Sequence, residues 1–297
     1  MILVTGGTGF IGKHLVRELV SLGLPVRTLI KPSSKSPNLP TGIPVDVTVC
    51  SLNDERGLMA ALKDVDIIFH LAGTERLATR ADLSGVDING TRTLVQAATK
   101  SQIERFFYLS HLGADQNSAY PVLKAKALAE KAIVNSNLPY TIFRSSHVFG
   151  PGDQFVTSIA NVLKRSPGLF LMPSEGETAL QPLWIEDLIA CFVLSIQDQS
   201  HINQYFDIGG GEIFTFREIV EKILNQINLN RILLNFSPPY LRMFSVFVDQ
   251  YFPRFPLSLY WLDALAEDRT TNLDVLPRLF GILPARFENK LSFLSEL

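Results

Sequence analysis

The chain has 297 residues, of which 46% are apolar and 19% are charged. Such a composition supports one large hydrophobic core, or a core with a small lobe, and it excludes an intrinsically disordered protein. The formal net charge of -2 gives no electrostatic basis for binding a polyanion, so we expect no nucleic-acid partner.

The cysteine pattern and the N-terminal sequence favour a cytoplasmic protein. Cys50 and Cys191 lie far apart and have neither CxxC nor metal-ligand spacing, so we interpret both as core thiols of a reducing compartment and expect no metal. The opening MILVTGG is typical of a strand, so we expect no cleavable signal before the fold. No stretch has the ~18 continuous apolar residues of a spanning helix. We therefore expect the cytoplasm, or the cytoplasmic face of a membrane.

The first half of the chain alternates short apolar runs with segments of helical period. The expected strands are 2–5, 26–30, 45–49, 66–71, 105–110 and 140–144. Segment 11–22 is predicted to be a helix with one buried face, formed by Ile11, Leu15, Leu19 and Leu22. Segment 82–100 is predicted to be another, with a face formed by Val86, Gly90, Leu94 and Ala97. This succession predicts an α/β fold with a doubly wound parallel sheet.

The pattern becomes irregular after FGPGDQF, and it is richer there in proline and aromatic residues. Helices are expected at 186–196 and 216–227. We place a boundary near Gly150, with the sheet domain at 1–150 and, at 151–297, a smaller C-terminal α+β lobe for substrate or partner that is interleaved with it.

The opening TGGTGFIG lies between the first strand and the first helix, where a glycine-rich motif is informative. Gly6 allows a tight turn, Gly9 lets the backbone approach a pyrophosphate, and Gly12 lets the helix pack on the sheet. The alternative is a turn that needs glycine without a ligand. We expect a dinucleotide to contact Gly6, Thr8, Gly9, Phe10, Ile11 and Gly12.

The end of the second strand indicates which dinucleotide binds. A carboxylate there would bind the ribose 2′-hydroxyl of NAD, but the chain reads VRTLIKP, with Arg27 and Lys31. A cation at this place suits the 2′-phosphate of NADP, so we predict that NADP(H) is preferred over NAD(H). The alternative for Lys31 is an ordinary solvated lysine.

TGGTGFIG, together with HLAG at 70–73, VDINGT at 86–91, RFFYLSHLGA at 105–114 and VFGPGD at 148–153, resembles the extended and atypical short-chain dehydrogenase/reductase superfamily. Within it the sequence is similar to the branch that holds the nucleotide-binding accessory subunit of respiratory complex I and its bacterial relatives, which is NmrA-like or epimerase-like. The resemblance implies a Rossmann fold. It also implies that the nucleotide is contacted by Leu71, Ala72, Gly73, Ser110 and Ser145.

The resemblance implies a catalytic tetrad of asparagine, serine, tyrosine and lysine, and this chain departs from it. Asp87 takes the place of the asparagine, while Asn89 falls on a variable position. His111 takes the place of the second serine of the usual SS, which leaves Ser110 one residue early, and Ser145 replaces the usual proline. His111 has the pKa range to orient or protonate a carbonyl, or it is simply a hydrogen-bonding residue at a strand end.

Two registers compete for the tyrosine and lysine. Tyr120 and Lys124 satisfy YxxxK, and a spacing of four places both on one helical face. Counted instead from the following KALAE, the lysine is Lys126 and the tyrosine position is Val122, which cannot titrate. Pro121 is favoured at the first helical position, which would make Tyr120 a cap outside the regular helix. The tetrad therefore looks eroded, although the nucleotide half of the site looks intact.

The segment 238–265, from Pro238 to Leu265, contains a helix with a wide apolar arc at 240–252. We predict a narrow polar stripe of Arg242, Ser245 and Asp249 on this helix. The arc is too short to span a bilayer, but it could dock on a membrane surface or an apolar partner. The alternative is that it completes the core of the lobe or a dimer contact.

Two classes of function follow from these features. The first is a nucleotide-binding structural, assembly or redox-sensing subunit of a membrane complex. The second is an NADP-dependent reductase or epimerase acting on a small apolar carbonyl compound. Turnover of bound nucleotide discriminates them.

Overall fold

The computed structural model describes residues 1–33, 42–251, 262–263 and 265–296. Contacts divide the chain into two compact units, each discontinuous in sequence. The first unit comprises Met1–Glu75, Asp82–Ser145 and Ile189–Asp207, and the second comprises Arg76–Ala81, Ser146–Leu188 and Ile208–Leu297. The boundary near Gly150 stays a prediction.

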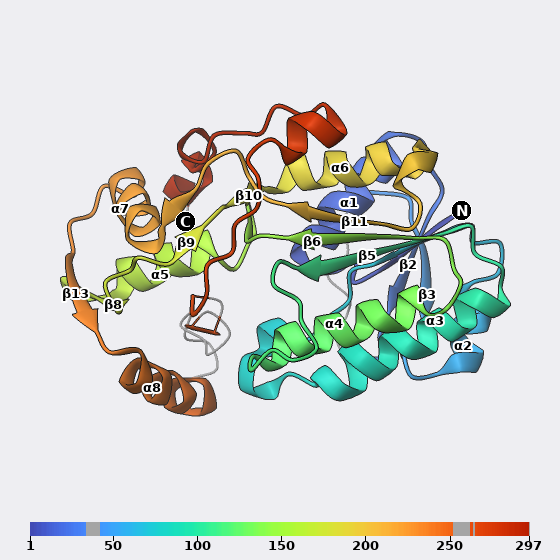
Figure 1. Ribbon diagram of the computed structural model, residues 1–297, viewed down its shortest axis with the longest axis horizontal. Helices are drawn as coiled ribbons and strands as arrows, with labels where there is room; N and C mark the ends of the chain where they lie inside the picture. The colour runs from blue at the N-terminus through green and yellow to red at the C-terminus, as the bar shows by residue number, and fades with distance from the viewer. Residues whose placement is uncertain (34–41, 252–261, 264, 297) are drawn as a thin grey trace. The chain divides into compact units, whose positions relative to one another are not determined.

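A seven-stranded sheet forms the first unit, in the order β3-β2-β1-β4-β5-β6-β11 (Figure 1). From β3 to β6 in this order, each strand pairs in parallel with the next. The strands are β1 (Ile2–Thr5), β2 (Val26–Ile30), β3 (Asp46–Val49), β4 (Ile67–His70), β5 (Arg105–His111), β6 (Tyr140–Ser145) and β11 (Gln204–Ile208). The central strand β1 is buried along its whole length, as expected of a parallel sheet covered on both faces. The predicted doubly wound α/β fold is confirmed, and β11 is a further strand that was not predicted.

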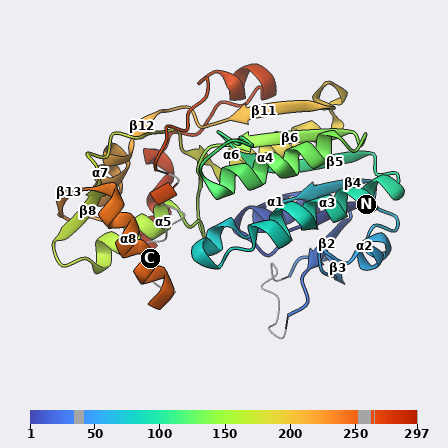
Figure 2. The same cartoon turned by 60° about the horizontal axis from the view of Figure 1, so that its bottom comes forward.

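Helices cover both faces of this sheet, with α1 and α6 on one face and α2, α3 and α4 on the other (Figures 1 and 2). The helical segments of the first unit are α1 (Phe10–Ser21), α2 (Glu55–Ala61), η2 (Leu83–Gly90), α3 (Thr91–Lys100), α4 (Pro121–Val134) and η3 (Gln199–His201). Two more segments, η1 (Glu75–Arg80) and α6 (Ile185–Gln197), have residues in both units. Leu58 of α2, Leu94 of α3 and Ile133 of α4 belong to one buried core cluster. Cys50 and Cys191 are buried free thiols, as predicted.

Helix ends differ in places from the predicted ones. Leu22 was expected on the buried face of α1, but it follows the last helical residue and is 50% exposed. Segment 82–100 contains a π-helix followed by an α-helix. The buried face was predicted for an α-helix with 3.6 residues per turn, and the wider turn of the π-helix changes that spacing. Pro121 stands at the first position of α4 and Tyr120 is its N-cap, as predicted.

The second unit is the smaller α+β lobe that the sequence predicted. Its elements are β7 (Val148–Phe149), α5 (Val156–Arg165), β8 (Leu169–Pro173), β9 (Ala179–Leu180), β10 (Leu183–Trp184), β12 (Phe214–Thr215), α7 (Phe216–Gln226), β13 (Ile232–Phe236), α8 (Pro238–Tyr251), η4 (Leu276–Phe280), η5 (Glu288–Lys290) and η6 (Ser292–Glu296). Strands β8 and β13 form a parallel pair. Helix α7 begins at a reciprocal capping box between Thr215 and Glu218, which fixes its first turn.

Helix α8 exposes several of its large apolar side chains, and its predicted polar stripe is divided between buried and exposed positions. Ser245 of the predicted polar stripe is fully buried, as is Leu241, while Arg242 of the same stripe is exposed and forms an ion pair with Asp263. The exposed large side chains of the helix include Tyr240, Met243, Phe247 and Tyr251. Residues 252–261 of the predicted docking segment lie outside the described residues. Among the helices of the described ranges, none combines the length and apolar character needed to cross a bilayer.

Candidate functional site

The glycine-rich loop joins β1 to α1 at the carboxyl edge of the sheet. Gly6 has a φ of 74°, and a Cβ there would lie 2.7 Å from the backbone carbonyl of Leu71. A Cβ on Gly12 would lie 2.2 Å from the carbonyl oxygen of Gly6. Gly9, the N-cap of α1, offers no side chain to the first N–H groups of the helix. The loop therefore requires glycine on steric grounds, and it presents helix N–H groups suited to a pyrophosphate.

The remaining predicted residues of this loop lie around the first turn of α1. Thr8 is exposed at the tip of the loop, while Phe10 and Ile11 are half-buried. The ring of Phe10 packs edge-on against His14, with 5.4 Å between the ring centroids. This packing leaves the backbone N–H groups of Phe10 and Ile11, rather than their side chains, as the groups that would face an anion.

The loop that leaves β4 lies directly beside the glycine-rich loop. Leu71 donates its backbone N–H to the carbonyl of Thr5 at 3.2 Å, and Ala72 donates to the Thr5 hydroxyl at 3.3 Å. Gly73 is exposed, and it is followed by Thr74 in the same loop. The predicted residues 71–73 therefore lie where β1 and β4 diverge, which is the topological switch point of the strand order.

A buried histidine ties these two loops to α3. His70 is fully buried; its Nδ1 lies 2.7 Å from the Thr5 hydroxyl and its Nε2 lies 2.8 Å from the Thr91 hydroxyl. Because Thr91 donates its own proton to the carbonyl of Asp87 at 2.6 Å, it must accept from Nε2–H. Thr5 then donates to Nδ1. Burial lowers the pKa of His70 to about 3, so the ring is neutral at physiological pH.

The two cations of the second strand have different environments. Arg27 lies within β2, and its guanidinium donates to the Asp46 carboxylate at 2.6 Å and to the carbonyls of Ala61 and Lys63 at 2.8 and 2.7 Å. Lys31 follows the last residue of β2 and is exposed. Arg27 is thus engaged by hydrogen bonds within the first unit, and Lys31 is the cation at the carboxyl end of the strand.

The ends of β5 and β6 carry the predicted serines and histidine. Ser110 is fully buried and Ser145 is 2% exposed, whereas His111 is half-buried. The register pairs His111 with Ser145, and Leu112 donates its N–H to the Ser145 carbonyl at 3.0 Å. Of these three side chains, His111 is the one that the strand geometry leaves partly open.

The two candidate lysines of α4 lie on different sides of the helix. Lys124 is exposed, and Tyr120 lies before the first turn as its N-cap. Lys126 is 5% exposed, and its Nζ donates to the Leu109 carbonyl at 3.5 Å and lies 5.5 Å from the ring centroid of Tyr108. The packing of α4 thus turns Lys126, and not Lys124, toward the carboxyl end of β5.

Lys126 belongs to a charged cluster that we define as Glu75, Asp87, His111 and Lys126. Glu75 Oε1 lies 3.7 Å from Lys126 Nζ and 3.8 Å from His111 Nε2. Asp87 accepts hydrogen bonds from the backbone N–H and the hydroxyl of Thr74, at 3.1 and 2.5 Å. Burial raises the pKa of Asp87 to about 6, which the positive charge of Lys126 partly offsets and the negative charge of Glu75 increases.

Glu75 is the one member of this cluster that the sequence did not single out. A Cβ on Gly73 would lie 2.2 Å from Glu75 Oε2 and 2.9 Å from Asp87 Oδ1, so glycine at 73 leaves room for both carboxylates. The available signal was the position of Glu75 in the loop leaving β4, at the edge of the sheet where ligands of such folds bind.

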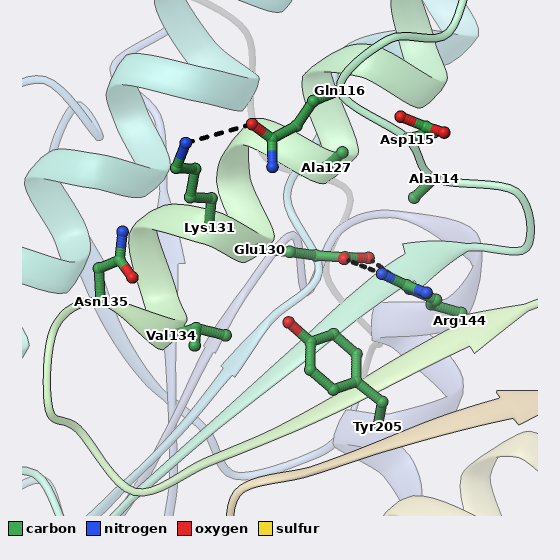
Figure 3. Close-up of a pocket in the computed structure, with 10 residues that line it drawn as sticks. All are labelled: Ala114, Asp115, Gln116, Ala127, Glu130, Lys131, Val134, Asn135, Arg144 and Tyr205. Atoms are coloured by element: carbon green, nitrogen blue, oxygen red, sulfur yellow. Dashed lines mark hydrogen bonds and ion pairs between the residues drawn. The ribbon is translucent and has the colours of Figure 1, made fainter.

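A separate cavity of about 320 Å³ lies between α4, the loop that precedes it, β6 and β11 (Figure 3). Arg144 forms a bidentate ion pair with Glu130, at 3.0 and 2.5 Å, and its guanidinium lies 4.8 Å from the ring centroid of Tyr205. On the other side of the cavity Lys131 donates to Gln116 at 3.3 Å. None of the predicted site residues lines this cavity. The Glu130–Arg144 pair therefore acts as a brace between α4 and β6.

The cradle at 6–12, the adjoining loop at 71–73 and the lysine buried at the same edge fit a dinucleotide. They define the first unit as a dinucleotide-binding α/β domain. Residues 6–155 match the NAD(P)H-binding family, and the chain belongs to that family, within the extended, epimerase-like short-chain dehydrogenases/reductases.

Curated relatives are similar over much of the chain. The mitochondrial NADH dehydrogenase (ubiquinone) 1 alpha subcomplex subunit 9 of Arabidopsis thaliana is 28% identical over 75% of this chain and 57% of its own length. The ceramide reductase of Caulobacter vibrioides is 28% identical over 65% of this chain and 60% of its own length. The chain thus spans about three fifths of the length of these relatives.

The fold is shared with solved structures. MoeE5, solved in complex with UDP-glucose and NAD, superposes with a TM-score of 0.77 at 19% identity, covering 99% of this chain and 97% of that one. At this level of identity the likeness extends to the fold alone.

Proposed function

We propose that this protein holds NAD(P)(H) as a structural or redox-sensing ligand of a membrane-associated complex and turns it over slowly or not at all. The observation that carries the proposal is Val122, which stands one helical turn before the buried Lys126. In the superfamily this place belongs to the acid/base tyrosine, and valine cannot transfer a proton. Missing acid/base groups commonly cost ~100- to 10,000-fold in rate. Similarity to a complex I subunit supports the same reading.

The exposed apolar side chains of α8 support attachment to a membrane surface or an apolar partner. Met243 is 68% exposed and Phe247 is 53% exposed, and both are large. Large apolar patches of this kind mark interaction sites on soluble domains. We propose that the segment 238–265 is that docking surface.

The preferred nucleotide is proposed to be NADP(H), on the basis of Lys31. It is exposed directly after β2, and Arg27 is already engaged by Asp46. A single charge-assisted contact from Lys31 would favour the 2′-phosphate roughly ten- to a hundredfold.

A second candidate is an NADP-dependent reductase or epimerase acting on a small apolar carbonyl compound. His111 favours it, because its half-buried ring lies 3.8 Å from the Glu75 carboxylate and could exchange a proton. The similarity to a ceramide reductase points the same way.

Turnover separates the two candidates. The protein is purified, its bound nucleotide is identified, and oxidation of NAD(P)H is followed with a panel of carbonyl compounds. The proposal expects nucleotide binding, turnover below ~1 per second, and no effect of Tyr120→Phe on either. Turnover above that rate that is lost in Tyr120→Phe or His111→Ser would establish the reductase instead. Absence of nucleotide binding would refute both candidates.

A further inference from the structure

We propose that Glu75 and Asp87 bias the nucleotide site toward the oxidised form, NAD(P)+, over NAD(P)H. The inference rests on the proposed function and adds to it the redox state that the site reads.

Glu75 and Asp87 both adjoin Gly73, in the loop that leaves β4 beside the glycine-rich cradle. Lys126, the lysine that α4 turns toward this edge, lies 3.7 Å from Glu75. The carboxylates therefore lie at the edge of the sheet that carries the glycine-rich loop and the start of α1, where no side chain caps the helix. This is the place where a dinucleotide would bind.

A superfamily site with asparagine and serine at these positions has one full charge, that of the lysine. Here Lys126 is accompanied by two carboxylates, Glu75 and Asp87, and by the titratable His111. Glu75 and Asp87 add two acidic groups to the single cationic side chain of Lys126, so the cluster is more negative than a site that holds the lysine alone.

The nicotinamide ring is a cation when oxidised and neutral when reduced, so added carboxylates stabilise the oxidised form relative to the reduced form. A unit charge ~8 Å away, at an effective dielectric constant of ~20 to 40, changes an affinity about 5- to 30-fold. The low exposure of Glu75 and Asp87 reduces screening by salt.

The test is the ratio of two dissociation constants, for NAD(P)+ and for NAD(P)H, measured by calorimetry on the full chain. We expect the wild type to bind NAD(P)+ more tightly by at least about fivefold, and Glu75→Gln or Asp87→Asn to reduce that preference about 5- to 30-fold. The matched control is Glu104→Gln, an exposed carboxylate immediately before β5, at the opposite end of the strand from His111. Its removal should leave the ratio unchanged.

The outcomes separate the inference from the proposed function. Binding of both forms with a ratio that neither carboxylate variant changes overturns the inference alone, as does tighter binding of NAD(P)H by the wild type. Failure of the wild type to bind either form overturns the proposed function and the inference together. A melting curve for each variant establishes that it is folded, and the double variant Glu75→Gln/Asp87→Asn provides a second measurement if one single variant is unstable.

Discussion

Substituting His70 should change how the stability of the protein depends on pH. The imidazole accepts a hydrogen bond from the Thr5 hydroxyl at Nδ1 and donates one to Thr91 from Nε2, and it is fully buried. Protonation would desolvate a charge and replace the acceptor that Thr5 needs with a donor. The native state therefore holds the neutral ring, with a pKa of about 3 compared with an ordinary value of 6.5.

The sign and size of the effect follow from this shift. Because the unfolded chain binds the proton more tightly, stability is complete above pH 6.5 and is lost as the pH falls toward 3. Each pKa unit corresponds to ~1.4 kcal/mol, so His70 alone should cost about 3 kcal/mol of stability by pH 4. His70→Gln keeps a donor and an acceptor but cannot titrate, so it should lack this loss.

The assay is urea unfolding of the wild type and His70→Gln, followed by circular dichroism from pH 7 to pH 4. The difference between their free energies of unfolding should shift by about 3 kcal/mol across this range, in favour of the variant at low pH. NMR titration should show the His70 ring neutral down to about pH 4. Parallel stability curves, or a His70 ring that titrates near 6.5 in the folded protein, would refute the reasoning.

Three further predictions concern the charged cluster, the nucleotide and α8. The pKa of Asp87 is raised from 3.8 to about 6, so its contribution destabilises the fold as the pH rises through this window. Asp87→Asn should therefore gain about 2 kcal/mol relative to wild type between pH 4 and pH 7 in the same urea series. Lys31→Asp should abolish a roughly tenfold or greater preference for NADP(H) over NAD(H) in calorimetric titrations, and equal wild-type affinities would contradict the assignment. The double variant Met243→Ser/Phe247→Ser should release the protein from liposomes or from its partner with little change in melting temperature. Leu241→Ser, at a 1% exposed position, should lower the melting temperature sharply. A strongly lowered melting temperature of the double variant, together with no binding by the wild type, would contradict docking.

Local chemistry made the cradle predictable. Gly6 and Gly12 occupy positions where a Cβ would collide with the backbone, so the need for glycine is expressed within a few consecutive residues. The helix start at Pro121 is likewise local, because proline fixes its own φ and lacks the N–H that a first helical residue would leave unpaired. Strands β1, β2 and β4 to β6 follow from short apolar runs that a covered parallel sheet requires.

Long-range contacts decided the rest. Strand β13 pairs with β8 across some 60 residues, from Ile232 to Leu169, and neither run carries a local signal of that pairing. Helix α8 shows how packing overrides amphipathic pattern, since Ser245 is buried while Phe247 is exposed.

The sequence by itself determined that a dinucleotide cradle exists, because its glycines lie within seven consecutive residues, 6–12. It also departs, at Asp87 and His111, from the tetrad that the resemblance implies. It left Lys124 and Lys126 as alternatives, since the periodicity of a helix does not specify which side meets the sheet. The tertiary structure turned Lys126 inward, with Nζ 3.7 Å from Glu75, a residue 51 positions earlier in the chain. Charge at this site is therefore set by contacts between distant segments, and only the packing of α4 on the sheet brings them together.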